Sequence, residues 1–516
     1  MGKRNNRADK DHNLGGNQSI ESLLQQAINA HQSSKLEQAI TLYRRVLALQ
    51  PTHPDALNFA GMAHIQLGEP EKAVRLLQKA TAKHSAFAEA HQNLGVALNK
   101  LERFKEAVKA YQQLTRLKPH HAPGFNDLGI VLRRLGRHDE AVDAFSKALE
   151  IAPDYAEAHA NLGNVLKNLD KLDEAAESYR RAISSSPDLV SAHRSLGLVL
   201  QLQGKLDEAI SSYRRAIEIE PGYATTHADL GRALVEKEQI EDGVACLRRA
   251  LEINPRAPEV HTSLSIALFD LGDLQGSKKA LDDSLELDPG NTHALANKAI
   301  VLHSLQEEDS LNELVDFDRL IQPVHIDSAS GYNSLDDFNA ALTRFACEHP
   351  SLQQGRVTKT TRNGSQTDAL FPAARKEAKA LERVIRKSVD RYIRERDRET
   401  DHPFLARPPR RYQLHCWATV LDAGGHQAAH VHPAGWLSGV YYAKIPEVIG
   451  DRDQSGWIEF GRPDPRFYET SDFPVRVMKP VEGLMVLFPS YFWHRTLPFE
   501  SQEQRISFAF DILAES

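Results

Sequence analysis

Hydrophobic and polar positions follow two different periods in this chain, and the change of period divides it. Over residues 22–327 the apolar positions recur at the three- and four-residue spacing of amphipathic helices, and the whole pattern repeats every 34 residues without an insertion. Over residues 411–516 short stretches alternate apolar and polar positions, as strands with one buried face do. The pattern therefore predicts a multidomain α + β chain, in which an array of paired helices precedes a β domain.

Each 34-residue unit has the same characteristic residue types at the same positions. A proline closes the second helix of a unit, because proline cannot continue a helix. The closing positions are Pro51, Ser85, Pro119, Pro153, Pro187, Pro221, Pro255, Pro289 and Pro323. A small residue lets the two helices of a unit approach closely, and a large residue fills the gap between them. These pairs are Gly61 with Leu77, Gly95 with Tyr111, Gly129 with Phe145, Gly163 with Tyr179, Gly197 with Tyr213 and Gly231 with Leu247.

This pattern resembles that of tetratricopeptide repeats and covers about nine units. The resemblance implies an N-terminal α-solenoid over residues 22–327. The last unit has Ala299 in place of the glycine and lacks the consensus second helix, as terminal capping repeats often do.

A column of small polar residues occupies one position of the first helices, which line the concave face of such a solenoid. Its amides and carboxyls can hydrogen-bond the backbone of an extended peptide, and the AHxNLG wording resembles the repeats of the eukaryotic O-linked N-acetylglucosamine transferase, whose asparagine ladder binds peptides. The alternative is a solvated polar helix face. The column holds Asn93, Asp127, Asn161, Ser195, Asp229, Ser263 and Asn297. Histidines two positions earlier are expected to be packing residues, namely His91, His159, His193, His227 and His261.

Composition limits the kinds of partner and the cellular location that we expect for the chain. The chain has 516 residues, 41% of them hydrophobic and 26% charged, and a net charge of −7, so it has no overall nucleic-acid signature. No apolar run reaches the length of a membrane span, and residues 1–21 are expected to form a disordered polar tail without a signal peptide. The cysteines show no paired spacing, which favours a cytoplasmic location; they are Cys246, Cys347 and Cys416.

Residues 328–410 are expected to connect the two parts and to brace the β domain with helices. One helix should start after a Ser334 cap and run to residue 347, and a charged amphipathic helix should cover residues 373–397. Between them, residues 360–367 are predicted to be a polar loop.

The predicted strands carry a set of chemically informative side chains. His430 and His432 alternate on one face, and His494 follows on a later strand, so all three can hold one metal ion and leave open positions on it. Arg505 and Ser507 share the inward face of the last strand, where a guanidinium beside a hydroxyl suits a carboxylate.

The order HxH, then a distant histidine, then RxS resembles the iron(II) and 2-oxoglutarate-dependent dioxygenases, which share a double-stranded β-helix, or jelly roll. The wording HxHPxxxLSGVYY…LFPSxxxHxxxPF…RISFAF looks like a bacterial group of 2-oxoglutarate oxygenases that is often fused to tetratricopeptide repeats. The resemblance implies Fe2+ bound by His430 and His494, and 2-oxoglutarate held by Arg505 and Ser507. His432 stands where the wider family has Asp or Glu; it either ligates as a neutral third histidine or leaves the iron to the other two.

Two alternatives remain open at this point. Gly424 with the HxH motif and Gly483 with Pro489 and His494 also match parts of the cupin motifs, which would remove 2-oxoglutarate. The second alternative is a repeat-based binding scaffold with an inactive β-helix. The dioxygenase interpretation, with a protein or peptide substrate recruited into the repeat groove, is favoured because of Arg505 and Ser507.

Among the other aromatic and acidic residues, Tyr441 and Tyr442 are expected to divide between core and site. Trp436, Trp457 and Trp493 are expected to pack, and Glu459 to form a salt bridge on a strand face.

Overall fold

The computed structural model describes residues 19–354, 360–371, 375–396, 401–406, 408–450, 453–465 and 472–515. Most of the tail predicted over residues 1–21 therefore lies outside the described residues. The chain divides into two units, Met1–Gly222 and Tyr223–Ser516, which are described separately.

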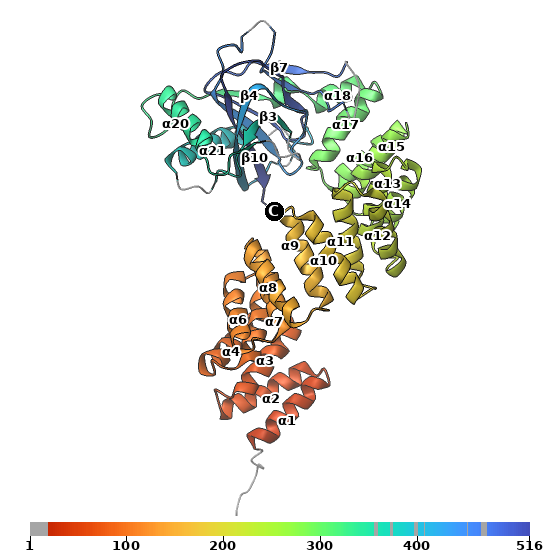
Figure 1. The fold of residues 1–516 in the computed structure, drawn as a ribbon, viewed down its shortest axis with the longest axis vertical. Coiled ribbons are helices and arrows are strands. Elements are labelled where there is room, and N and C mark those ends of the chain that lie inside the picture. Colours follow the sequence, from red (N-terminus) through yellow and green to blue (C-terminus); the bar gives the residue numbers. More distant parts are fainter. Residues whose placement is uncertain are drawn as a thin grey trace, which may run out of the picture. The chain divides into compact units, whose positions relative to one another are not determined.

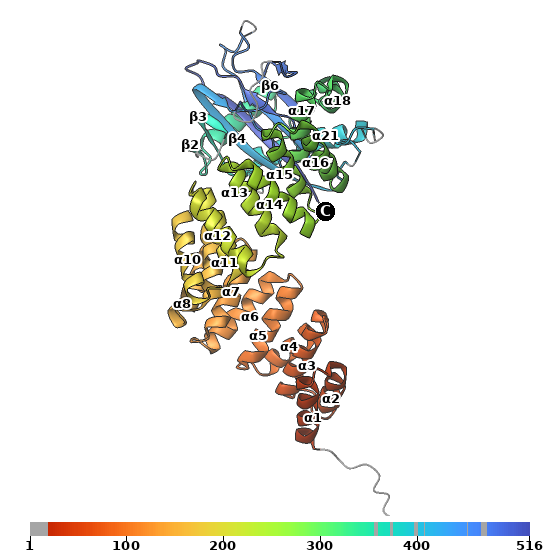
Figure 2. The same cartoon turned by 90° about the vertical axis from the view of Figure 1, so that its right-hand side faces the viewer.

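The first unit consists of helix pairs (Figures 1 and 2). Within each pair the two antiparallel helices are joined by a short turn, and the next pair follows after a second turn near the predicted proline. The helices are α1 Ile20–Gln32, α2 Leu36–Leu49, α3 Pro54–Gln66, α4 Pro70–Lys83, α5 Ala88–Lys100, α6 Phe104–Leu117, α7 Ala122–Arg134, α8 His138–Ile151, α9 Ala156–Asn168, α10 Leu172–Ser185, α11 Val190–Leu202 and α12 Leu206–Ile219.

The predicted pairing of glycines with large residues is confirmed. A Cβ added at Gly95 would lie 2.6 Å from the Tyr111 ring, and one at Gly163 would lie 2.8 Å from the Tyr179 ring. Both tyrosines are buried. The ring thus packs directly on the backbone of the facing helix, which only glycine permits at this distance.

The histidines of the first helices brace the turns between repeats. The Nε2 atoms of His91, His159 and His193 lie 3.0, 2.7 and 2.8 Å from the carbonyl oxygens of Ser85, Pro153 and Pro187, each six residues earlier. His261 makes the same contact with the Pro255 carbonyl at 3.1 Å. Their predicted packing role is confirmed for these four.

The second unit begins with further repeat helices and then changes to strands. The last repeat lacks a full-length second helix, as predicted, with only the short α18 in its place, and its proline lies in a strand instead of closing the repeat. Pro323 belongs to β1 Gln322–His325, which pairs antiparallel with β8, so the strand structure starts before the boundary expected at residue 327. The helices are α13 Ala224–Glu236, α14 Ile240–Ile253, α15 Pro258–Asp270, α16 Leu274–Leu287, α17 Thr292–Ser304, α18 Glu308–Leu314 and α19 Phe317–Leu320.

Two antiparallel sheets form the jelly-roll-like domain that the sequence predicts. The larger has the order β1-β8-β5-β10-β4-β3-β2, and the smaller has the order β7-β6-β9. The rings of Phe460 on β6 and Phe488 on β8 lie 4.9 Å apart, so the sheets pack on one another. The remaining strands are β2 Gln353–Gln354, β3 Thr361–Gln366, β4 Tyr412–Gln427, β5 Leu437–Lys444, β6 Ile458–Phe460, β7 Arg476–Met478, β8 Leu484–Pro489, β9 His494–Thr496 and β10 Arg505–Ala514.

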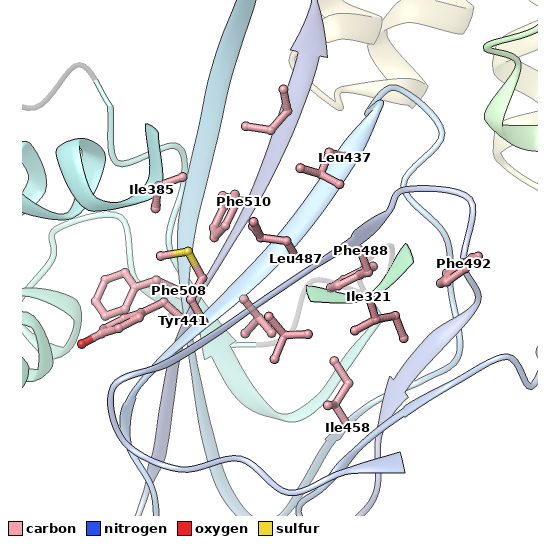
Figure 3. Packing of buried hydrophobic residues seen from close by; sticks show 14 of the residues in the cluster. Ile321, Ile385, Leu437, Tyr441, Ile458, Leu487, Phe488, Phe492, Phe508 and Phe510 are labelled. Atoms are coloured by element: carbon pink, nitrogen blue, oxygen red, sulfur yellow. The ribbon is translucent and has the colours of Figure 1, made fainter. Parts of the chain in front are cut away.

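The predicted bracing helices are present as α20 Leu335–Cys347 and α21 Lys376–Arg396. Ser334 caps α20 by accepting a hydrogen bond from the Asp337 backbone N–H at 3.0 Å. In Figure 3, Phe508 and Phe510 of β10 lie on the side of the sheet that carries Ile385 of α21. These residues belong to one buried cluster, which also includes Leu295 and Ile300 of α17. The last repeat and the jelly roll therefore share a core.

The prediction of a loop over residues 360–367 is wrong, because Thr361–Gln366 form β3, paired with β4. The inward side chains of this strand are polar or absent, which hides the usual alternation. Gln366 donates to Thr419 Oγ1 at 3.4 Å, and a Cβ at Gly364 would meet the Val420 carbonyl oxygen at 2.6 Å.

Within the part of the chain that the structure describes, no helix has the length and apolar character needed to cross a bilayer.

Candidate metal centre and cosubstrate pocket

The three predicted histidines come together from two segments. His430 and His432 lie in the extended segment between β4 and β5, and His494 begins the short strand β9. An isolated antiparallel bridge joins His430 to His494, and the His432 backbone N–H donates to the Ser490 carbonyl at 2.9 Å. One candidate ligand atom from each residue lies within 4.8 Å of the others, so a single ion between them is within reach of all three.

One nitrogen of each ring is already engaged, and this orients the rings. His430 Nδ1 lies 2.7 Å from the Ala428 carbonyl oxygen, and His494 Nδ1 lies 3.0 Å from that of Phe492. His432 Nδ1 lies 2.7 and 2.9 Å from the two carboxylate oxygens of Asp511. With Nδ1–H donating in each case, Nε2 carries the free lone pair that a metal requires.

Burial keeps two of the rings neutral. Together with a smaller effect of the neighbouring His432, it lowers the pKa of His430 to about 4. Burial also holds the pKa of His494 well below its ordinary value, with smaller contributions from His430 and His432. Neutral imidazole is the form that binds metal, so these rings need lose no proton near neutral pH.

Asp511 is a site residue that the sequence analysis missed. Besides His432 it contacts Ser438, whose hydroxyl donates to a carboxylate oxygen at 2.7 Å. The Ser438 and Ser490 hydroxyls are 2.8 Å apart. The signal was present, because Asp511 has the same strand parity as Arg505 and Ser507 on β10. Trp417, also missed, stacks on His432 with ring centroids 5.7 Å apart.

Arg505 is a buried cation with unused hydrogen-bond donors. It is 1% exposed, and its Nε and Nη1 have no hydrogen-bond partner among the described residues. Burial lowers its pKa, while Tyr442 raises it. A buried guanidinium without an anion is costly, so the pocket is suited to receive a carboxylate.

The surroundings of Arg505 fit the same ligand. The register places Ser507 of β10 opposite Tyr442 of β5, and the guanidinium carbon lies 5.0 Å from the Tyr442 ring centre. The Tyr442 hydroxyl is buried and has no hydrogen-bond partner in the described part of the chain. Burial raises the pKa of Tyr442 to about 12, against the opposing effect of Arg505, so its hydroxyl keeps its proton and can donate it.

The two tyrosines lie on opposite faces of β5: Tyr442 lies beside Arg505, and Tyr441 donates to Asn339 Oδ1 at 2.6 Å on the other face. Glu459 forms the predicted salt bridges, with Arg462 and Arg495 at 3.0 and 2.7 Å. Trp436 packs on Phe404 with centroids 4.7 Å apart.

The polar column of the repeats lies on the first helices as expected, and several of its members already have partners. Asn93 and Asn161 donate across the repeat boundary to Asn58 and Asn126, at 2.8 and 3.0 Å. Asp229 is buried and ion-paired with Arg232. Asn297 donates to the His293 carbonyl at 2.8 Å.

Two other members of the column, Asp127 and Ser195, are half-buried. Burial raises the pKa of Asp127 to about 6. The column therefore offers carboxyl and amide acceptors for a peptide, while some of its donors are used between repeats.

The donor set fits the groups that the resemblance implies. Three imidazole nitrogens, a ligand type that suits iron(II), converge on one point, and a buried guanidinium with free N–H groups fits the distal carboxylate of 2-oxoglutarate. Strand β10 carries both Arg505 and Asp511, the residue that contacts His432, and so links the two groups of residues.

Family models match both parts of the chain. Residues 415–511 match the family described as "Putative 2OG-Fe(II) oxygenase". Tetratricopeptide-repeat models match between residues 30 and 265. No curated protein matches the chain.

Several solved structures are similar to part of the chain. They include the APC/C hetero-tetramer Cut9-Hcn1, at 18% identity over 55% of this chain and 56% of that chain, with a TM-score of 0.40. They also include YrrB, a TPR protein with an unusual peptide-binding site, at 26% identity over 35% of this chain and 92% of that one, with a TM-score of 0.31. The chain thus spans little more than half of the Cut9-Hcn1 chain that it matches.

The chain thus combines tetratricopeptide repeats, matched between residues 30 and 265, with a domain that matches the "Putative 2OG-Fe(II) oxygenase" family over residues 415–511 and holds the three converging histidines and the buried Arg505.

Proposed function

We propose that the chain is an iron(II)- and 2-oxoglutarate-dependent dioxygenase that hydroxylates a protein or peptide. The observation that carries this proposal is the pair of unpartnered donors on buried Arg505, on the same strand that holds Asp511 against His432. In a cupin that binds only a metal ion, no anionic ligand would offset the cost of burying an unpaired guanidinium.

When bound, iron and 2-oxoglutarate would supply the oxidising chemistry, in which dioxygen, 2-oxoglutarate and a substrate C–H bond give succinate, carbon dioxide and an alcohol. The chain's own residues bind and orient. His430, His432 and His494 would hold the metal through Nε2. Arg505 and Ser507 would hold the distal carboxylate, with the Tyr442 hydroxyl as an additional donor.

A cavity of about 780 Å3 between the last repeats and the metal-ligand segment supports a macromolecular substrate. Its walls include Thr262 and Ser263 of α15 on one side, and Pro433, Ala434 and Gly435, which directly follow His432, on the other. Thr292 at the start of α17 donates to the Gly435 carbonyl at 3.0 Å, which fixes this segment to the array. A peptide lying along the first helices of the last repeats, α15 and α17, would therefore contact the segment that directly follows His432.

The test is isothermal calorimetry of 2-oxoglutarate against the protein loaded anaerobically with iron(II), followed by measurement of succinate in air. We expect metal-dependent binding and slow succinate formation without substrate. Metal binding without any 2-oxoglutarate binding would replace this proposal by the cupin-like scaffold.

A further inference from the structure

We propose that Asp511 is the charge partner of the metal centre, acting through His432 in place of the carboxylate ligand that this chain lacks. The inference rests on the proposed function only for the presence of the metal. Asp511 is here a positioning residue, since one imidazole ring separates it from the ion.

Asp511 is held by several hydrogen bonds in a largely buried position. Its two oxygens lie 2.7 and 2.9 Å from His432 Nδ1, and the pair is largely buried, with side-chain exposures of 16% for Asp511 and 11% for His432. Ser438 donates to the same carboxylate at 2.7 Å. Among the described residues, no lysine or arginine forms an ion pair with Asp511, so its charge is not neutralised by a structural cation.

The negative charge of Asp511 can compensate part of the positive charge of a metal ion at the three histidines. Three neutral imidazoles leave both positive charges of a divalent ion uncompensated, whereas an acid ligand would remove one of them. A carboxylate that accepts the Nδ1–H of a ligating histidine fixes the tautomer with Nε2 free and increases the basicity of that nitrogen. Asp511 thus supplies, through the imidazole of His432, the negative charge that the wider family supplies with a carboxylate ligand.

The environment of His432 holds this arrangement in place. The His432 backbone donates to the Ser490 carbonyl, and the Ser490 hydroxyl contacts that of Ser438. Trp417 covers one face of the ring. The imidazole is therefore held on three sides with its Nε2 edge toward His430 and His494, whose ring centroids lie 5.0 Å away in each case.

The experiment is a double-mutant cycle read out by Co2+ affinity and by the electronic spectrum of the bound Co2+, both independent of turnover. Asp511→Asn keeps the shape and one acceptor oxygen but removes the charge. We expect Co2+ affinity to fall roughly 10- to 100-fold in the otherwise wild-type chain. Ser438→Ala, which removes a brace and leaves the charge, should cost less than a few-fold.

The second arm uses His432→Asp, which moves the acid into direct contact with the ion. In that background Asp511→Asn should be neutral or should improve Co2+ affinity, because the two carboxylates would repel each other. An equal loss in both backgrounds would assign Asp511 a structural role only, and unchanged affinity in the wild-type background would overturn the inference as well. A wild-type protein that binds no Co2+ would reject the metal centre itself, which is a distinct result. Thermal unfolding of the metal-free variants checks that each one is folded.

Discussion

The backbones of His430 and His494 hydrogen-bond to each other in both directions, His430 N–H to the His494 carbonyl at 3.1 Å and the reverse at 3.0 Å. The two segments are therefore paired through the main chain, whatever their side chains. It follows that the imidazoles can be removed without unpairing the strands, so ligand substitutions should report on the metal and not on the fold.

The first prediction uses this separation. His494→Ala should abolish stoichiometric iron(II) binding, because one of three ligands is lost, while the metal-free protein keeps a cooperative unfolding transition. Iron content after anaerobic loading and gel filtration is the measurement. His325→Ala, an exposed histidine on β1, is the matched control and should bind iron normally. Full iron occupancy in the folded His494 variant would contradict the site.

The second prediction concerns Arg505. Arg505→Met preserves an unbranched, buried side chain but removes the donors, so 2-oxoglutarate affinity should fall roughly a hundredfold, equivalent to about 2–3 kcal/mol. Because the native guanidinium is buried without an anion, the ligand-free protein should be as stable as wild type or more so. Calorimetry and denaturant unfolding measure the two effects.

Arg476→Met serves as the control for Arg505, since Arg476 is half-exposed on β7 and pairs with Asp318. It should leave 2-oxoglutarate affinity unchanged. A strongly destabilised Arg505→Met protein that still binds 2-oxoglutarate would show that the guanidinium is a structural group.

The third prediction concerns acid stability without metal. The pKa of His430 is lowered to about 4 in the folded protein, so between that value and its ordinary 6.5 the unfolded chain binds more protons. Stability must therefore fall as the pH drops from about 7 to 4, by on the order of 3 kcal/mol from this ring. Asp127 has a raised pKa and acts in the opposite direction, so the comparison should be made against His430→Gln. Parallel pH–stability curves for the two proteins would refute the expectation.

The fourth prediction tests the packing of the repeats. Gly163→Ala should destabilise the array by about 1–3 kcal/mol, although alanine favours helix, because its methyl group would meet the Tyr179 ring. Gly290→Ala is the control, since its nearest contact would be an ordinary 3.4 Å. In the last repeat, alanine at position 299 is matched by the smaller Val315 in place of the aromatic, so adding Tyr179→Val should recover part of the loss. Urea unfolding measures all three.

The fifth prediction concerns recruitment. Replacing Asn93, Asn161 and Asn297 with alanine should raise the KM for a protein substrate and leave substrate-free succinate formation unchanged, because the column is remote from the metal ligands in the sequence and on different elements. Loss of both activities would instead follow from breaking the Asn93–Asn58 and Asn161–Asn126 hydrogen bonds and unfolding the repeats. Unchanged KM would mean that the column is a solvated helix face.

The repeats could be predicted closely because their contacts are local and recur at a fixed spacing, as with Gly95 and Tyr111. The clustering of the three histidines could be predicted because His430 and His432 share the parity of one strand face and His494 begins a later strand. Strand β3 could not be predicted, because its inward side chains are polar or absent and lie against polar groups such as Thr419. Asp511 was missed because an acid inside an apolar strand reads as an interruption, and only its partner His432, 79 residues away, explains it.

The core that α17 shares with the jelly roll limits which repeats can be gained or lost during evolution. Whole 34-residue repeats can be duplicated or deleted near the N-terminus without exposing Leu295 or Ile300, so the length of the array can change without disturbing the jelly roll. The last repeat has no such freedom, because its core is continuous with that of the jelly roll. A recombinant fragment that starts at residue 328 would lack β1 and one wall of its own interior.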